Sequence, residues 1–318
     1  MRIIVGERSL PRGGADAARV VALLGVLLLA AAPARAQQLG QKVLGGVGIG
    51  AGLQPDSGLY IIDRFLYYAA DRLRDREGRV VPIRGLDIDA YGNAFGASLT
   101  VKPRGAPFLN FAAAAPLARI SLSSTDPRTA IDRAGLGDMT VQPLKLGWRW
   151  RGGDVVAAYT FYAPTGRFEP RGGGVGRGFW THQFSVGGAA FRKRERPWRA
   201  SALASYDLNL RKRGIDIRRG NSLQVQGGAG VGILRVAVVG VAGYAFWQVS
   251  DDRGTDVPPA LRGLRTRVYA LGPELDVAIP RLRLQGEVRA EWEFGVKART
   301  QGHVLVAGLT YQAWRPGR

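Results

Sequence analysis

Polar and apolar side chains alternate along much of this chain with a period of two residues. Between Trp198 and Leu210 the even-numbered positions are aromatic or aliphatic, whereas the odd-numbered positions are nearly all polar. The segments Leu223–Ile233 and Leu282–Val296 repeat the pattern. Successive side chains of a β-strand point to opposite faces of the sheet, so each segment has one apolar and one polar face. A helix cannot use this pattern, because a period-two stripe winds around all of its sides.

Segments of this kind have the length that a tilted strand needs to cross a bilayer, roughly 9–11 residues. We therefore predict an all-β fold, an antiparallel transmembrane β-barrel of about 12 strands over residues 58–314. The alternation is weaker in Val236–Val249 and His303–Trp314. After residue 36 the sequence contains no apolar run of roughly 18 residues, so a helical membrane protein is not expected.

The links between the predicted strands alternate in length. Pro280-Arg281 and Leu234-Arg235 are tight, whereas Asp251–Leu264 and Arg211–Gly220 are long. Barrels of the bacterial outer membrane have short periplasmic turns and longer external loops, and an even strand number puts both termini on the periplasmic side. The same pattern predicts a modest external loop at Lys297–Gln301.

Residues 1–36 have the three-part pattern of a cleaved signal peptide, which predicts export to the outer membrane. A basic start precedes the apolar stretch Val20–Ala32. Ala34 and Ala36 then supply the small residues that a signal peptidase requires at positions −3 and −1 before the cleavage site. Residues 37–57 contain the glycine-rich run Gly45–Gly52, which either tucks into the barrel as a plug or forms a periplasmic strand. Residues 315–318 form a short tail after the last strand.

The formal charge of +20 raises nucleic-acid binding as a possible class of function. Only six of the 45 basic residues are lysines and the basic residues are scattered, which is typical of a coding bias rather than of phosphate contacts. We therefore expect no nucleic-acid partner. The absence of cysteine excludes a disulfide framework, a thiolate nucleophile and a cysteine metal site.

Aromatic residues concentrate near the predicted strand ends. Rings with a polar tip favour the boundary between headgroups and hydrocarbon, so we predict aromatic girdles at both interfaces, with ordinary core aromatics as the alternative. The residues are Trp148, Trp150, Phe161, Tyr162, Phe179, Trp180, Trp198, Tyr244, Phe246, Trp247, Tyr269, Trp292, Phe294, Tyr311 and Trp314.

Charged residues of both signs fall on the polar faces and are predicted to line the lumen. They fit two arrangements equally well, namely ion-pair ladders inside the barrel or a field across an open channel. The candidates are Lys145, Arg149, Asp207, Glu274, Asp276, Arg283, Glu287, Arg289, Glu291 and Glu293.

Several short stretches resemble, in order and spacing, the phenol-degradation MetA-pathway family of outer-membrane transporters and the related SphA family. The resemblance implies a channel or transporter for hydrophobic or aromatic compounds and supplies no catalytic residue. Trp314 departs from the common pattern of outer-membrane barrels, because four residues follow it instead of the chain ending on an aromatic. The stretches are Ser57–Gly78, Gly137–Pro143, Ala163–Phe168, Gly178–Thr181 and Leu271–Glu274.

An outer-membrane lipid-modifying enzyme is one alternative. A serine or threonine nucleophile needs a base, usually histidine, and the chain has only His182 and His303. His182 and Ser185 are three residues apart in a predicted strand, so they face opposite sides and form no dyad. Two isolated histidines also lack metal-ligand spacing. We expect no enzyme, no catalytic or metal residue and no cofactor.

A structural or surface-binding barrel without transport is the other alternative. The basic loops Arg167–Arg177 and Arg211–Arg219 could hold lipopolysaccharide phosphates, but solvated loops are the reading that we favour. The expected partners are outer-membrane lipid and lipopolysaccharide, the barrel-assembly machinery and a small hydrophobic or aromatic solute.

Overall fold

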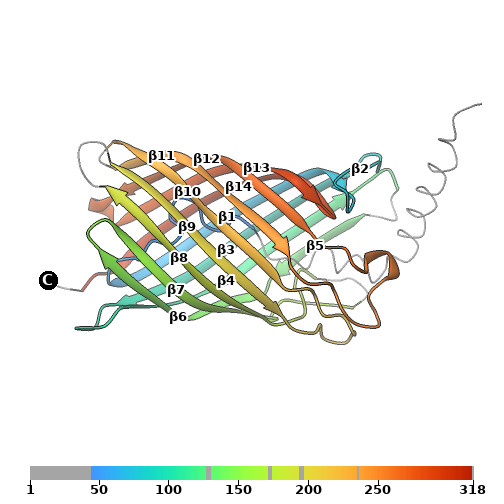
Figure 1. The fold of residues 1–318 in the computed structure, drawn as a ribbon, viewed down its shortest axis with the longest axis horizontal. Coiled ribbons are helices and arrows are strands. Elements are labelled where there is room, and N and C mark those ends of the chain that lie inside the picture. Colours follow the sequence, from blue (N-terminus) through green and yellow to red (C-terminus); the bar gives the residue numbers. More distant parts are fainter. Residues whose placement is uncertain (1–43, 127–129, 171–173, 193–196, 235, 317–318) are drawn as a thin grey trace, which may run out of the picture.

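The computed structural model describes residues 44–126, 130–170, 174–192, 197–234 and 236–316. The predicted signal peptide, residues 1–36, lies outside the described residues, as do residues 37–43 of the N-terminal segment and 317–318 of the tail. In the described part an antiparallel sheet closes on itself where β1 pairs with β14, giving an elongated barrel with tilted strands (Figure 1). None of the helices in the described ranges is long and apolar enough to cross a membrane.

Twelve long strands of the described residues form the wall, which confirms the predicted fold and strand number. The short strands β2 (Val80–Val81) and β5 (Ile131–Leu136) each pair with one neighbour, β1 and β4 respectively. The wall strands are β1 (Gly58–Arg74), β3 (Asp87–Val101), β4 (Phe108–Ser123), β6 (Met139–Trp150), β7 (Gly153–Ala163), β8 (Thr181–Arg192), β9 (Trp198–Asn209), β10 (Ser222–Leu234), β11 (Ala237–Gln248), β12 (Arg267–Ile279), β13 (Leu284–Lys297) and β14 (Arg299–Trp314).

The alternation in the sequence places apolar residues outside and polar residues inside. On β9, Trp198 and Tyr206 are 43% and 39% exposed, whereas Ser205 and Asp207 are 2% and 3% exposed. The reverse distribution is normal in a soluble protein, where large apolar side chains are buried. An outer wall of this kind is stable when lipid covers it, so the barrel is a transmembrane fold.

Four of the predicted girdle residues do not belong to the girdles. Tyr162 is on the inward side of β7, with the buried Thr160, and lies under the buried guanidinium of Arg177. Tyr244 and Phe246 are buried on the inward face of β11, and Phe179 is buried beneath the external loops. The prediction counted nearness to a strand end and ignored which face the alternation assigns to the residue. Eight of the predicted girdle residues are exposed: Trp148, Trp150, Trp180, Trp198, Trp292, Phe294, Tyr311 and Trp314.

Two external links differ from the predicted loops. β13 ends at Lys297 and β14 begins at Arg299, so a tight turn replaces the predicted loop, with Ala298 in the left-handed region at φ 51°. The expected long link over residues 125–138 contains β5, which extends the sheet beyond the wall. The short 3-10 helices η2 (Pro259–Leu261) and η3 (Pro280–Leu282) lie in an external and a periplasmic link respectively.

Candidate functional site

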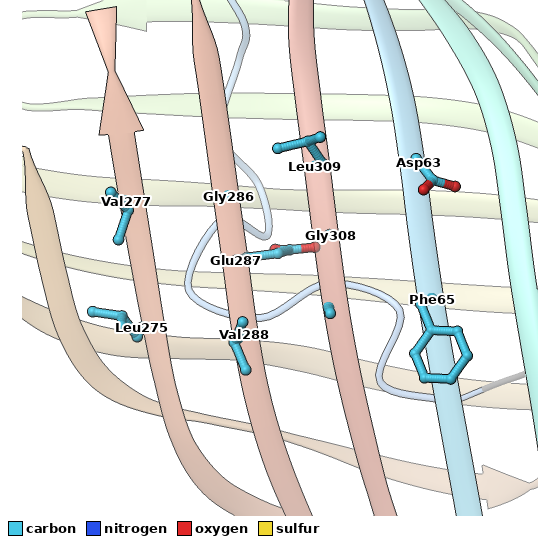
Figure 2. Close-up of a pocket in the computed structure, with 10 residues that line it drawn as sticks. Asp63, Phe65, Leu275, Val277, Gly286, Glu287, Val288, Gly308 and Leu309 are labelled. Atoms are coloured by element: carbon cyan, nitrogen blue, oxygen red, sulfur yellow. The ribbon is translucent and has the colours of Figure 1, made fainter.

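The N-terminal segment, residues 44–57, lies inside the barrel and spans from one wall to the opposite one. Its first residues contact β12 and β13, and its later residues contact β6 and β7. These strand pairs are on opposite sides of the twelve-stranded wall. The segment runs behind the strands of Figure 2 as a pale blue ribbon. The described part of the glycine-rich segment therefore contacts the inner wall of the barrel.

Glu274 and Arg289 hold the first half of this segment. The backbone N–H of Ile49 donates to Glu274 Oε2 at 2.9 Å, and Arg289 donates to the carbonyl of Gly45. On the other side, Ser201 Oγ donates to the carbonyl of Ile49 at 2.8 Å. A Cβ at Gly48 would lie 1.7 Å from Glu274 Oε2, so the close approach requires glycine.

A second set of side chains holds the segment near its exit from the barrel. Asp154 Oδ2 accepts from the backbone N–H of Gln54 at 2.9 Å, and Lys145 Nζ donates to the carbonyl of Leu53 at 2.8 Å. Arg149 donates to the carbonyl of Gln54 and pairs with Asp154 at 2.8 Å. These charge-assisted bonds are stronger than bonds between neutral groups, so the segment is anchored at both ends.

The charged residues of the lumen pair with one another across neighbouring strands. Arg64 reaches Glu287 at 2.7 Å, and Arg289 lies 3.5 Å from Glu287 and 3.7 Å from Glu291. Arg289 also lies 3.9 Å from Glu274. Of the two predicted arrangements, the ion-pair ladder describes this wall, because Arg289 and Glu291 are buried and their charges require opposite partners.

Three of these acids approach the geometry of a cation site. Carboxylate oxygens of Glu274, Asp276 and Glu287 lie within 4.8 Å of one another. Each acid is also paired with an arginine, Asp276 with Arg199 and the other two with the ladder described above. We assign the group to ion pairing.

The other predicted lumen residues differ in their surroundings. Asp207 accepts from Gln183 at 2.7 Å, and Glu293 accepts from Tyr244 at 2.8 Å. Arg283 is not on a strand, because β13 begins at Leu284 and Arg283 occupies the turn after η3 at φ 56°. The prediction had extended the alternation two residues too far, into a turn.

Sequence reasoning missed three charged residues that belong to the inward set. Arg64, Arg199 and Asp154 pair with predicted residues, at 2.7 Å for Arg64 and 2.8 Å for Asp154. Arg199 occupied the polar face of the alternating segment on β9, so the pattern contained the signal that would have found it. Their partners come from other strands, which no single segment reveals.

An apolar cluster occupies one wall of the lumen in its external half. It joins inward residues of β1, β11, β12, β13 and β14, and Leu44 of the N-terminal segment packs into it. Val296 belongs to it because Gly295, at φ 59°, interrupts the alternation and turns the next side chain inward. The cluster consists of Leu44, Leu66, Tyr244, Phe246, Val268, Ala270, Val296, Val304 and Val306, with Tyr68 against it.

Three external loops pack together over the mouth, and their described residues are 164–170 with 174–180, 210–221 and 249–266. Arg218 forms backbone bridges to both Arg211 and Arg253. Asp216 accepts from the backbone N–H and the hydroxyl of Thr255, both at 2.9 Å. We call this assembly the external cap. It has an apolar core of its own, which includes Phe179, Ile217, Val257 and Leu261.

Basic side chains inside the cap contradict our expectation of simply solvated loops. Arg177, Lys212 and Arg219 are all buried, whereas Arg213 and Arg218 are exposed as expected. The pKa of Lys212 is lowered to about 7, chiefly by burial and then by the charge of Arg219, while Asp252 raises it and Arg177 lowers it.

A shallow apolar depression lies on the outer, lipid-facing side of the wall (Figure 2). It has a volume of about 300 Å³ and lies over Gly286, with Leu275, Val288 and Leu309 around it. Asp63 borders it, and Asp63 Oδ1 has no hydrogen-bond partner among the described residues. Glu287 of the ion-pair ladder is also among its lining residues.

His182 does not form a catalytic pair with Ser185. Its Nδ1 atom lies 2.7 Å from the hydroxyl of Tyr159, beside Phe184 on the outer face. Ser185 instead lies 2.9 Å from Ser205, on the inner face. The two side chains therefore point to opposite sides of the wall, as the spacing predicts.

The family model described as "Putative MetA-pathway of phenol degradation" matches residues 70–307, which is more than half of the chain. The chain belongs to this family. Two of the stretches that carried the resemblance, Gly137–Pro143 and Ala163–Phe168, meet in this family member at Asp138, and Arg177, directly before a third stretch, joins them. Asp138 accepts from the backbone N–H groups of Gly166 at 3.1 Å and Arg177 at 3.0 Å, and so ties β6 to the cap.

Solved structures resemble the barrel at low sequence identity. The COG4313 outer membrane channel from Pseudomonas putida F1 has a TM-score of 0.72 and 12% identity, over 85% of this chain and 99% of that one. The transport unit of the autotransporter AIDA-I from Escherichia coli has a TM-score of 0.51 and 11% identity, over 89% and 97%. These likenesses show an outer-membrane barrel fold. No curated protein sequence matches the chain.

Proposed function

We propose that this MetA-pathway family member is an outer-membrane channel that passes hydrophobic or aromatic compounds through its lumen. The apolar cluster around Leu44 carries the proposal. Apolar side chains inside a barrel do not bind water or ions. An apolar solute that moves from water onto such side chains lowers its free energy. The likeness to an outer-membrane channel from Pseudomonas putida and the description of the family support the same function.

The N-terminal segment acts in this proposal as a plug. It occupies the lumen between the apolar cluster and the periplasmic end, held by Glu274 and Arg289 on one wall and by Asp154 and Lys145 on the other. A solute that follows the apolar wall replaces Leu44 in the cluster. Passage then requires the anchors to open, so the resting channel conducts poorly.

The inward charges line the remaining path. Glu291 borders the plug, because it lies against Gly45, and Glu287 pairs with Arg64 on the same inner wall. Arg283 is left out of this lining, since it occupies the periplasmic turn. Charge reversal at Glu287 or Glu291 breaks the ladder and changes the current of the open channel.

Location and partners follow from the outer surface. The lipid-facing wall and the family support a place in the outer membrane. To this the proposal adds phospholipid and lipopolysaccharide as the surroundings and the barrel-assembly machinery as the route of insertion. Residues 1–36 are the proposed cleaved export signal. The proposal assigns no enzymatic role, and the separation of His182 from Ser185 supports that choice.

Uptake by intact cells tests the function. Cells that lack the gene should take up a radiolabelled aromatic compound more slowly, and the wild-type gene should restore the rate. Val306→Asp puts a charge into the apolar cluster and should not restore it, while the outward Leu305→Asp tests for simple loss of the barrel through heat-modifiable migration on gels. Equal uptake with and without the gene would exclude the function.

A further inference from the structure

Three exposed arginines lie side by side on the external cap. The backbone of Arg218 is bridged to Arg211 on one side and to Arg253 on the other, and both bridges are antiparallel. All three side chains are exposed. Arg253 comes from a different loop than the other two, so the arrangement, which we call the arginine row, exists only when the cap is folded.

The backbone pairing brings the three side chains to one face. Residues that pair in an antiparallel bridge point to the same side of the sheet. The N–H of Lys212 donates to the carbonyl of Ile217 at 2.8 Å, which makes Arg211 and Arg218 a non-hydrogen-bonded pair. The Cα atoms of such a pair are about 4.5 Å apart. Arg218 and Arg253 exchange two backbone hydrogen bonds, at 2.7 and 2.9 Å, which puts their Cα atoms about 5.5 Å apart.

The opposite face of the same hairpin is buried. Lys212 and Ile217, the neighbours of Arg211 and Arg218 in the sequence, are 3% and 0% exposed in the core of the cap. Because successive residues of an extended chain point to opposite sides, the arginine row faces away from that core and toward solvent.

The arginine row is not neutralised by its surroundings. Like charges directly opposite each other in a sheet are destabilising. Asp216 pairs with Arg211 at 3.1 Å, and Arg218 Nε donates to the carbonyl of Asn209 at 2.9 Å. Within the part of the chain that the structure describes, neither Arg218 nor Arg253 forms an ion pair. An anion from outside the chain would therefore relieve the repulsion.

The other exposed arginines of the cap give a contrast. The described residues of the three loops contain ten basic and five acidic residues, so the cap as a whole attracts anions. Arg167 already pairs with Glu169 at 2.6 Å, and Arg265 already pairs with Asp251 at 2.7 Å. The positive charge of Arg218 and Arg253 has no such partner, which makes the arginine row the place where an anion gains most.

We propose that the arginine row binds the phosphate groups of lipopolysaccharide. A guanidinium group matches a phosphate with two parallel hydrogen bonds. Single ion pairs on a surface are weak, but several phosphates on one molecule that is held in the same leaflet bind together with a high effective concentration. A small anion contacts only part of the row and has no such advantage. The proposal rests on the outer-membrane location and is independent of transport.

Titration of the purified barrel in detergent with rough lipopolysaccharide, which keeps its phosphorylated inner core, tests the arginine row. Arg218→Gln combined with Arg253→Gln should weaken binding roughly tenfold or more. The matched control, Arg167→Gln combined with Arg265→Gln, removes the same charge from arginines that already have acidic partners, and should leave the affinity nearly unchanged. Heat-modifiable migration on gels checks that each protein is folded.

The single variant Arg253→Gln keeps the test valid if the double variant does not fold. The side chain of Arg253 makes no hydrogen bond or ion pair with a described residue, so its loss removes no internal contact. Arg253→Gln should weaken lipopolysaccharide binding, yet it should raise the thermal midpoint in detergent without lipopolysaccharide, because repulsion within the row decreases. A structural role for Arg253 would lower that midpoint.

Two further probes separate lipopolysaccharide phosphate from other ligands. Lipopolysaccharide whose phosphates have been removed with hydrogen fluoride should bind the wild type as weakly as intact lipopolysaccharide binds the double variant, and millimolar inorganic phosphate should not displace it. Equal affinity of the two double variants, equal binding of intact and dephosphorylated lipopolysaccharide, or displacement by inorganic phosphate would each overturn the proposal. Cells that express Arg218→Gln with Arg253→Gln should take up a neutral aromatic compound at the wild-type rate, and slower uptake would mean that the row serves the solute instead.

Discussion

Glu274 on β12 accepts a hydrogen bond from the backbone N–H of Ile49 at 2.9 Å, so a wall residue holds the N-terminal segment inside the lumen. This bond is buried, and its acceptor is a carboxylate. Bonds of this kind contribute more than those between neutral groups. Whether the N-terminal segment stays in the lumen therefore depends on the side chain of Glu274.

Glu274→Leu should release the plug more often. The loss of a charge-assisted bond of about 2 kcal/mol would raise the open fraction roughly thirtyfold. Glu274→Gln keeps an acceptor oxygen and should open less often than Glu274→Leu. Conductance steps in planar bilayers measure both, and identical traces for the wild type and Glu274→Leu would contradict the anchoring role.

Ile49→Ala should loosen the same segment through packing. The side chain of Ile49 is fully buried, and it fits against Gly228, Gly230 and Gly240, where a Cβ would meet it at 3.0 Å or less. Truncation leaves a cavity and typically costs about 2–5 kcal/mol in a core. Hydrogen exchange of residues 47–51 should become faster while exchange in the strands stays constant. Unchanged exchange would mean that Ile49 is not packed in the lumen.

Asp63→Leu should stabilise the barrel. The carboxylate is on the lipid-facing side, beside the depression of Figure 2, and its Oδ1 lacks a hydrogen-bond partner in the described residues. An acid facing lipid costs about 1 kcal/mol, depending on depth. The denaturation midpoint in urea with lipid vesicles should rise, and the converse change at its partner, Leu309→Asp, should lower it. A lower midpoint for Asp63→Leu would show that the acid has a stabilising partner.

The stability of the external cap should depend on pH through Lys212. Its pKa is about 7 in the folded cap, below the ordinary value of 10.5. Between these two values the unfolded chain binds a proton that the folded cap does not, so stability rises with pH from about 7 to 10.5 and is independent of this group below 7. The thermal midpoint of the wild type should increase more than that of Lys212→Met between pH 7 and 9. Parallel curves would exclude the effect.

The wall of the barrel could be predicted from the sequence because each strand carries its own evidence. On β9 the alternation from Trp198 to Asn209 assigns every side chain to lipid or lumen without reference to any other strand. Gly295 and Arg283 mark where the reasoning failed. Gly295 has a positive φ and interrupts the alternation, whereas Arg283 lies in a turn that ends it. Neither feature changes the hydrophobic pattern enough to be predicted from the sequence.

The site could be predicted only in part, because its partners come from distant segments. Glu287, Arg289 and Glu291 were found from one strand, and the alternation on β9 could have found Arg199. The ion pairs of Arg64 with Glu287 and of Arg199 with Asp276 join different strands, so only the structure shows them. The glycine-rich segment has no periodicity, and its contacts are with side chains of distant strands. Its place in the lumen therefore could not be predicted from the sequence. Likewise, nothing local distinguishes the buried Lys212 from the exposed Arg213 beside it.

Locking the plug tests the central claim most directly. The chain contains no cysteine, and a Cβ at Gly48 would lie against the side chain of Glu274, so an engineered disulfide between these two positions would join the plug to β12. In cells that express the double variant Gly48→Cys with Glu274→Cys, uptake of a radiolabelled aromatic compound should stop under oxidising conditions and return after reduction. Each single variant should be insensitive to oxidation. Uptake that continues at the full rate while the disulfide is formed would contradict transport through a lumen that the N-terminal segment closes.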